Sequence, residues 1–367
     1  MPAPCPVAPY YYTTTLHVIA AISIPLNMLG LYLVIYQSPG MSRYKHCLCF
    51  LQGATFLTEF HMTWVTPAYM FFPLLGGYNS IELTGHLIRS HLAMVIWLFW
   101  LCFELPAILL CFVYRHDAAL KMRMGAQRND HFKRFAVYAC LLFPFLTAFC
   151  FYWSELSREE AVAFLEQNYP QCLFWLENPV FVVYDYNTNP WVAVCGIGAL
   201  VFVSIFCTYS FALGIHTMLI LSHFRAHMSR QTYQMHKNAL VSLSLQVIIP
   251  AALIVTPLFF MLWVVILKAV EYQGQRPRRD RDATATRPQR NTFSEPAMAA
   301  FFGIASHSAC ATMVMLVTNP RFRKLIHERV MTTLRAAYFG GRQTMLVTVE
   351  PSSSMRAASS ICSPRRI

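Results

Sequence analysis

Glutamate and histidine side chains occur inside stretches that are otherwise apolar. The segment FLTEFHMTW, residues 56–64, places Glu59 and His61 in an apolar run, and Glu104 and His307 lie within two further runs. In such surroundings a carboxylate and an imidazole can form a structural hydrogen-bond network, recognise a ligand or relay protons. The sequence leaves all three roles open, and a structural network is the commonest of them.

A polar stripe surrounds Glu59. Polar residues follow one another at intervals of three and four, which places them on one face of a helix; they are Gln52, Thr55, Glu59, Thr63 and Thr66. A charged side chain at the centre of a bilayer costs roughly 2.5–3.5 kcal/mol on insertion scales, so this face should turn toward the interior of a helix bundle. His61 points to nearly the opposite side and should contact a different neighbouring helix.

Two overlapping sets of residues are therefore candidates for function. Arg89 and His91, near the outer end of the third apolar run, are better placed for ligand contact than Glu59 or Glu104. The residues that we predict to bind a ligand are Arg89, His91, Glu59, His61 and His307. The residues that we predict to form a polar network inside the membrane are Gln52, Glu59, Glu104, Gln246 and His307.

The elements that must hold these side chains are membrane-spanning helices. Hydrophobic residues make up 56% of the chain and charged residues 13%, a balance typical of an integral membrane protein. A spanning helix needs about 20 mostly apolar residues. The sequence contains seven such runs, at about 13–36, 47–74, 86–114, 135–153, 191–222, 239–267 and 296–318. We predict an all-α, seven-helix membrane bundle; a six-span protein in which 296–318 does not cross is the main competitor.

Lysine and arginine placement predicts the orientation. Basic residues gather in the segments 37–46, 115–134 and 223–238 and after residue 320, which all lie on one side of a seven-span bundle. The positive-inside rule places that side in the cytoplasm and the N-terminus outside. The basic loop at 272–294 falls on the wrong side for this rule, but late loops influence orientation less than early ones. The net charge of +12 then suits anionic membrane lipids and requires no nucleic acid.

The predicted domain organisation follows from these spans. Residues 1–12 form an extracellular N-terminus, 13–318 the transmembrane domain, 319–338 an amphipathic helix at the cytoplasmic membrane surface and 339–367 a disordered tail. The outer loop 154–190 is acidic and contains a helix start, with a capping box from Ser157 to Glu160. A folded lid over the mouth of the bundle fits this loop, and so does an inert cap.

Of the twelve cysteines, only Cys5 and Cys172 fall on the outer side, where disulfides persist. We predict that they form one bridge, and two free thiols are the alternative. No metal motif is found: the histidines of HFRAH, residues 223–227, have the spacing of a single histidine box but lack the further boxes that membrane oxygenases need. We expect no cofactor and no enzymatic activity, because nucleophile elbows and metal clusters are likewise missing from the sequence.

The chain resembles the nematode seven-transmembrane serpentine chemoreceptors of the class I and class H groups. The stretches that carry the resemblance are LHVIAAISIPLNMLGLYLVIYQSP, LTEFHMTWVTPAYMFFPLLGGY, LCFVYRH, HKNALVSLSLQVIIP and MLVTNPRFR. Glu59 stands where the resemblance leads us to expect an aspartate. The rhodopsin-type Asp-Arg-Tyr triplet is absent, and YRHD, residues 114–117, occupies that helix end.

The resemblance implies a G-protein-coupled receptor for a small environmental molecule, located in the plasma membrane and in sensory cilia. It implies signalling through a heterotrimeric G protein by a shift between two states of the bundle. The residues that we predict to contact the G protein are Arg115, His116, Arg225 and Arg230. The alternative is a transporter or ligand-gated channel that uses the intramembrane Glu and His residues, although the chain shows no internal repeat of the kind common in transporters.

Overall fold

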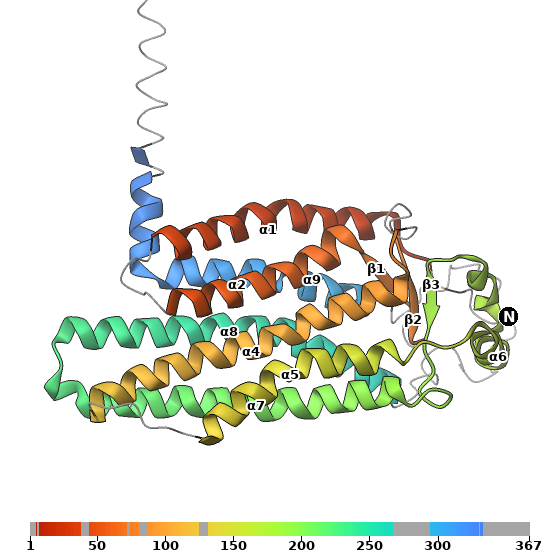
Figure 1. Cartoon of the computed structure of the whole chain (residues 1–367). Helices are drawn as coiled ribbons and strands as arrows, with labels where there is room; N and C mark the ends of the chain where they lie inside the picture. Colours follow the sequence, from red (N-terminus) through yellow and green to blue (C-terminus); the bar gives the residue numbers. More distant parts are fainter. Residues whose placement is uncertain are drawn as a thin grey trace, which may run out of the picture. The chain divides into compact units, whose positions relative to one another are not determined.

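The computed structural model describes residues 5, 7–37, 44–71, 74–80, 87–124, 131–266, 294–329 and 331–332. It divides into two compact units, 1–319 and 320–367, and each is described by itself. The long α-helices of the first unit are α1 (Tyr10–Tyr36), α2 (Tyr44–Phe60), α4 (Ser90–Met124), α5 (His131–Tyr152), α7 (Trp191–His223), α8 (Arg230–Ile266) and α9 (Ser294–Thr318). They form the predicted bundle (Figure 1).

Six helices of the described part of the chain are long and apolar enough to cross a membrane: α1, α4, α5, α7, α8 and α9. A helix satisfies its own backbone hydrogen bonds, which is why it can cross lipid. The remaining helix, α2, is 17 residues long and continues without a break into the π-helical segment η1 (His61–Val65). Its polar stripe lowers its hydropathy, yet at about 1.5 Å per residue α2 and η1 together have the length of a span.

The second predicted span extends too far. We expected it to reach residue 74, but the helix ends at Val65 and the chain turns into strand β1 (Ala68–Met70). Pro67 follows the helix directly, and the residue before a proline is disfavoured in helical geometry. Hydropathy could not show this end, because Tyr69 and Phe71 are apolar in a strand as well as in a helix.

A small antiparallel sheet closes this end of the bundle and was not predicted. Its order is β1-β2-β3, with β2 at Gly76–Asn79 and β3 at Phe181–Val183 (Figure 1). Tyr69 pairs with Tyr78, and Tyr78 with Phe181. A Cβ atom on Gly77 would lie 2.2 Å from the Tyr69 carbonyl oxygen, so only glycine fits there. We call this end of the bundle the sheet end.

Several helices run beyond the predicted spans at the opposite end. The third span was expected to end at 114, whereas α4 continues to Met124; the sixth was expected to begin at 239, whereas α8 begins at Arg230. Hydropathy marks where a chain enters lipid and not where its helix stops. Because many of the described arginines and lysines lie on these helix ends, for example Arg115, Lys121 and Arg230, we call it the basic end.

Two apolar clusters form the core of the bundle. One lies at the sheet end and includes Tyr12, Phe71, Leu165 and Phe301. The other joins α2, α4, α5, α7 and α8 around Phe112 and Leu243. In the first cluster Tyr78 stacks on Trp175 with ring centroids 4.5 Å apart. Burial raises the pKa of Tyr69 to about 12, so its hydroxyl stays neutral among these rings.

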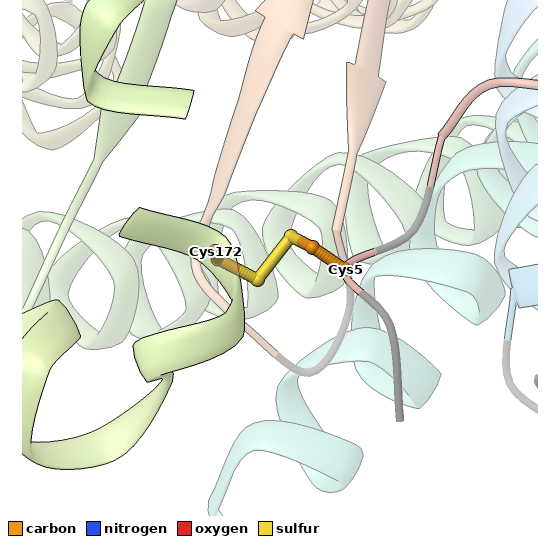
Figure 2. The surroundings of a disulfide bond; sticks show 2 residues. All are labelled: Cys5 and Cys172. Carbon is orange, nitrogen blue, oxygen red and sulfur yellow. A yellow bond between two sulfur atoms is a disulfide. The ribbon is translucent and has the colours of Figure 1, made fainter. Parts of the chain in front are cut away.

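The loop after α5 folds over the sheet end. Helix α6 (Arg158–Asn168) begins with the predicted capping box: Ser157 accepts from the Glu160 backbone N–H and donates its own backbone N–H to the Glu160 carboxylate. These hydrogen bonds lower the pKa of Glu160. The 3₁₀ helix η2 (Pro170–Glu177) follows and carries Cys172, which is joined to Cys5 by a disulfide (Figure 2).

The second unit contains helical residues at 320–329 and 331–332. Lys324 and Glu328 form an exposed i,i+4 ion pair with an N···O distance of 3.8 Å. The position of this helix on a membrane surface stays a prediction. The last residues of the predicted 319–338 helix, the 339–367 tail and all but the end of the 272–294 loop lie outside the described residues.

Candidate functional site

The polar stripe of α2 faces the interior of the bundle. Gln52, Thr55, Glu59, Thr63 and Thr66 are all buried, although they interrupt an apolar sequence. Thr63 uses its hydroxyl to donate to the Glu59 carbonyl one turn earlier, so it needs no partner on another helix. Gln52 and Glu59 instead reach neighbouring helices, and these two side chains begin the candidate site.

Asn27 on α1 is the centre of a hydrogen-bond network that joins three helices. Its Oδ1 accepts from Gln52 Nε2 at 2.7 Å, from Ser308 Oγ at 3.1 Å and from Thr312 Oγ1 at 2.5 Å. Gln52 also donates to Thr312. A Cβ atom on Gly30, one turn along α1, would lie 2.8 Å from Thr312 Cγ2, so glycine allows α1 and α9 to approach closely.

Glu104 on α4 and His307 on α9 meet in the same interior. Glu104 Oε1 lies 3.0 Å from His307 Nε2, and His307 Nδ1 lies 2.6 Å from the Ile304 carbonyl oxygen. A carbonyl only accepts, so Nδ1 carries a proton. The second proton of this pair then lies between Nε2 and the carboxylate: either Nε2 donates to an ionised Glu104, or a neutral Glu104 donates to Nε2. His307 is completely buried and Glu104 nearly so.

Glu59 is the second carboxylate near His307. Its Oε2 accepts from the Ala309 backbone N–H at 3.0 Å, and Ser23 and Ser308 lie beside it. Its Oε1 is buried and has no hydrogen-bond partner among the described residues, and the same holds for Asn27 Nδ2. An unsatisfied buried polar atom costs about 1–3 kcal/mol. The network is therefore not fully satisfied in this state of the bundle.

Gln246 does not join this network. Its Nε2 donates to Ser242 Oγ at 2.9 Å, and Ser242 lies 2.5 Å from the Thr318 hydroxyl. These bonds connect α8 to the last residue of α9, toward the basic end. Of the residues predicted to share a polar network, the structure brings together Gln52, Glu59, Glu104 and His307. Asn27 was missed; a single asparagine inside an apolar run was the available signal.

Arg89 and His91 connect α4 to the folded loop at the sheet end. His91 Nε2 lies 3.0 Å from the Tyr152 carbonyl oxygen and therefore donates, so Nδ1 accepts from the Tyr184 hydroxyl at 3.0 Å. Burial raises the pKa of Tyr184, which keeps that hydroxyl protonated as a donor. His91 is buried, whereas Arg89 is exposed and pairs with Glu155 at 2.6 Å.

His61 lies apart from Glu59, on the other side of its helix. It opens the π-helical segment, a feature often found at functional sites. Its Nε2 donates to the Ala93 carbonyl of α4 at 3.0 Å. Ala93 also lines a small pocket beneath the sheet, together with Thr66, Met94 and Asn79. Its volume is about 10 Å³, which holds roughly one water molecule.

At the basic end, three consecutive residues of α4 each contact a different helix. The Arg115 guanidinium lies over the Tyr44 ring of α2, with its Cζ 3.7 Å from the ring centroid. His116 Nε2 lies 2.9 Å from His216 Nδ1 on α7, and Asp117 accepts from Lys133 of α5 at 2.5 Å. We call these three pairs the basic-end contacts. The remaining predicted G-protein contacts, Arg225 and Arg230, are exposed.

Within the described ranges, no group of three or more His, Cys, Asp or Glu side chains has the arrangement of a metal site. The buried ionisable residues instead pair with helix neighbours. Chemically, the site can hold helices together, share a proton between Glu104 and His307, and change its hydrogen bonds when helices move.

A comparison with protein families gives one match. Residues 4–276 match the family model described as serpentine type 7TM GPCR chemoreceptor Sri. The match covers α1 to α8 and includes the sheet, the loop with Cys172 and all of the basic-end contacts. A comparison with curated proteins finds no significant match.

Proposed function

Because the chain belongs to the Sri family of serpentine seven-transmembrane chemoreceptors, a nematode family, we propose that it detects a small environmental molecule and signals to a heterotrimeric G protein. The family is one of receptors and not of enzymes. The single observation that carries the proposal is the match over residues 4–276. Several apolar helices support a multi-pass location, for which we propose the plasma membrane of sensory neurons and their cilia.

We propose that the sheet end faces outward, with the N-terminus outside the cell. Cys5 and Cys172 are joined at this end, and disulfides persist outside the cytosol. An epitope tag at the N-terminus should therefore be labelled by antibody in unpermeabilised cells, and a tag at the C-terminus only after permeabilisation. Two tags on the same side would contradict this orientation.

We propose that the ligand binds at the pocket beneath the sheet and that the pocket widens on binding. Binding pockets for small molecules usually hold 300–1,000 Å³, whereas this one holds about 10 Å³. A ligand must therefore displace the side chains around Thr66 and Met94. Among the predicted ligand contacts, His61 is connected to the pocket through its hydrogen bond to the Ala93 carbonyl. Arg89 and His91 would act through the loop that they connect to α4.

The test is a screen of volatile and water-soluble compounds on cells that express the receptor and a G-protein reporter. For an active compound, Met94→Trp should abolish the response by filling the pocket. Leu92→Trp, on the exposed side of the same helix turn, should preserve it. Ion flux into vesicles without a G protein would favour the transporter or channel instead, and equal responses of the two variants would refute the pocket.

A further inference from the structure

Trp97 on α4 carries a buried hydrogen-bond donor that has no acceptor in the described part of the chain. Its indole Nε1 is buried, and no hydrogen bond joins it to any described residue. An indole N–H can only donate. Because a buried donor without an acceptor is unfavourable, this N–H is suited to receive an acceptor that comes from outside the chain.

Trp97 lies on the face of α4 that lines the pocket beneath the sheet. Ala93 and Met94 line this pocket, and Trp97 follows them by four and three residues, which places it on the same face one helical turn away. Helix α4 begins with Ser90, which also lines the pocket. Since side chains on a helix lean toward its N-terminus, the Trp97 ring leans back toward the pocket.

The apolar packing at the sheet end supports the same placement. Trp97 packs against the apolar cluster of the sheet end, and so do Met70 and Tyr78, which both line the pocket. Met70 and Met94 have unbranched side chains that adapt easily to new neighbours. Their rearrangement can therefore widen the pocket toward Trp97 without a movement of the backbone.

Two hydroxyl groups of the pocket already have acceptors. Ser90 donates to the Val180 carbonyl oxygen at 2.6 Å, and Thr66 donates to the His61 carbonyl oxygen at 3.5 Å. A ligand that accepts from either hydroxyl must first break one of these bonds. The Trp97 N–H has no such bond to lose among the described residues, so a bound molecule can use it more readily.

We propose that Trp97 determines the ligand specificity of this pocket, and that the ligand is a small, neutral, largely apolar molecule with a carbonyl group, such as a ketone or an ester. The inference rests on the proposed function, because it concerns the same pocket. The indole N–H donates to the carbonyl oxygen, while the apolar part of the ligand contacts Ala93 and Met94. A neutral ligand fits, because a single neutral donor does not compensate the desolvation of an ionised group.

The test measures binding to the purified full-length receptor without a G protein. Ketones and esters of increasing size are each paired with a hydrocarbon of the same shape that lacks the carbonyl oxygen, and binding is measured by the rise in unfolding temperature. We expect the carbonyl compound of a pair to bind roughly fivefold more tightly, the size of one hydrogen bond. Trp97→Phe keeps an aromatic ring and should reduce this preference to near unity. Trp100→Phe, the same change on the same helix, should preserve it.

A second measurement identifies the donor directly. Of the signals from the seven indole N–H groups in a ¹⁵N-labelled receptor, the one that is lost in Trp97→Phe should shift when a ketone binds and stay in place with its hydrocarbon partner. Trp175 on η2 also has a buried N–H without a partner among the described residues. A ketone that shifts the Trp175 signal and not that of Trp97 would overturn the proposal. So would a panel in which no carbonyl compound binds, or a preference that persists in Trp97→Phe.

The G-protein reporter separates this inference from the proposed function. Selective binding of carbonyl compounds that depends on Trp97 but evokes no G-protein response would refute the signalling role and leave the Trp97 assignment standing. G-protein responses of equal size to the carbonyl compounds and their hydrocarbon partners would refute the Trp97 assignment and leave the signalling role standing.

Discussion

The two ends of the helix bundle are held together by different kinds of bonds. At the sheet end, a disulfide (Figure 2), backbone hydrogen bonds between strands and the buried His91 join the helices to the folded loop. At the basic end, α4 is held by three side-chain pairs, through Arg115, His116 and Asp117. A covalent bond and a sheet do not exchange partners readily, whereas side-chain pairs can separate one at a time. The comparison indicates that helix movement is easier at the basic end.

The polar network lies between these two ends and should respond to movement at either of them. Glu104 belongs to the same helix as the basic-end contacts, and His307 belongs to α9. A shift of α4 relative to α9 would change the position of the proton that the two side chains share. This provides a physical route by which a ligand at the sheet end can alter the basic end.

The largest effect on stability is expected from breaking the Glu104–His307 pair, which lies between the two ends of the bundle. His307→Ala leaves the Glu104 carboxylate buried without its partner, and removing one member of a buried pair costs about 3–5 kcal/mol. The variant should lose thermal stability in detergent. Unfolding is followed by intrinsic fluorescence and not by a thiol-reactive dye, because the chain contains free cysteines. Ser306→Ala is the matched control, because that hydroxyl only bonds carbonyls of its own helix. Equal stabilities of the two variants would contradict the role of the network.

Breaking the disulfide should rank next. Cys172→Ser should lower stability by about 2–5 kcal/mol, the usual cost of removing a native disulfide. Surface expression and thermal unfolding measure the loss. Cys150→Ser, at a free cysteine near the end of α5, should have little effect. A stable Cys172→Ser receptor would mean that the sheet and loop alone close this end.

At the basic end we expect a smaller loss of stability and, instead, a change in basal G-protein activation. His116→Ala removes the bond to His216, worth about 1 kcal/mol, and should raise basal G-protein activation several-fold with little loss of surface expression. His227→Ala, exposed on the 3₁₀ segment η3 (Phe224–His227), is the control. Unchanged basal activation in His116→Ala would indicate that this contact does not hold the inactive state.

The smallest effect is expected for the exposed pair at the sheet end. Arg89 and Glu155 are 2.6 Å apart, but the Arg89 side chain is 78% exposed. Exposed ion pairs contribute about 0–1 kcal/mol, so Arg89→Ala should unfold at nearly the wild-type temperature, as Arg158→Ala should. A large loss in Arg89→Ala alone would show that this pair closes the sheet end together with the disulfide.

The sequence was sufficient to predict a feature where residues recur at a regular spacing, or where the membrane topology restricts which residues can meet. The intervals from Gln52 to Thr66 predicted a buried stripe, and the Ser157–Glu160 spacing predicted a helix start. The structure pairs the same two cysteines, Cys5 and Cys172, that topology singled out. Seven apolar runs predicted the helices, because each crossing must be long and apolar.

The strands, Asn27 and the contact between His116 and His216 have no comparable pattern in the sequence. The strands are three and four residues long, too short for an alternation of polar and apolar residues to be visible. Asn27 is a neutral side chain in an apolar helix. Its role is visible only through the hydrogen bonds that it accepts from Gln52 and Thr312, which are distant in sequence. The contact between His116 and His216 depends on the rotation of α4 against α7, which only the packed bundle determines.

The central claim, that the basic end moves more easily than the sheet end, can be tested by distance measurements between α4 and α7. Spin-labelled unnatural amino acids would replace Lys121 and Ser222 at the basic end and, in a second receptor, Leu92 and Val194 at the sheet end; all four positions are exposed. Distances would be recorded with and without a nucleotide-free G protein. We predict that the Lys121–Ser222 distance changes and the Leu92–Val194 distance does not. A change at the sheet end without one at the basic end would contradict the claim.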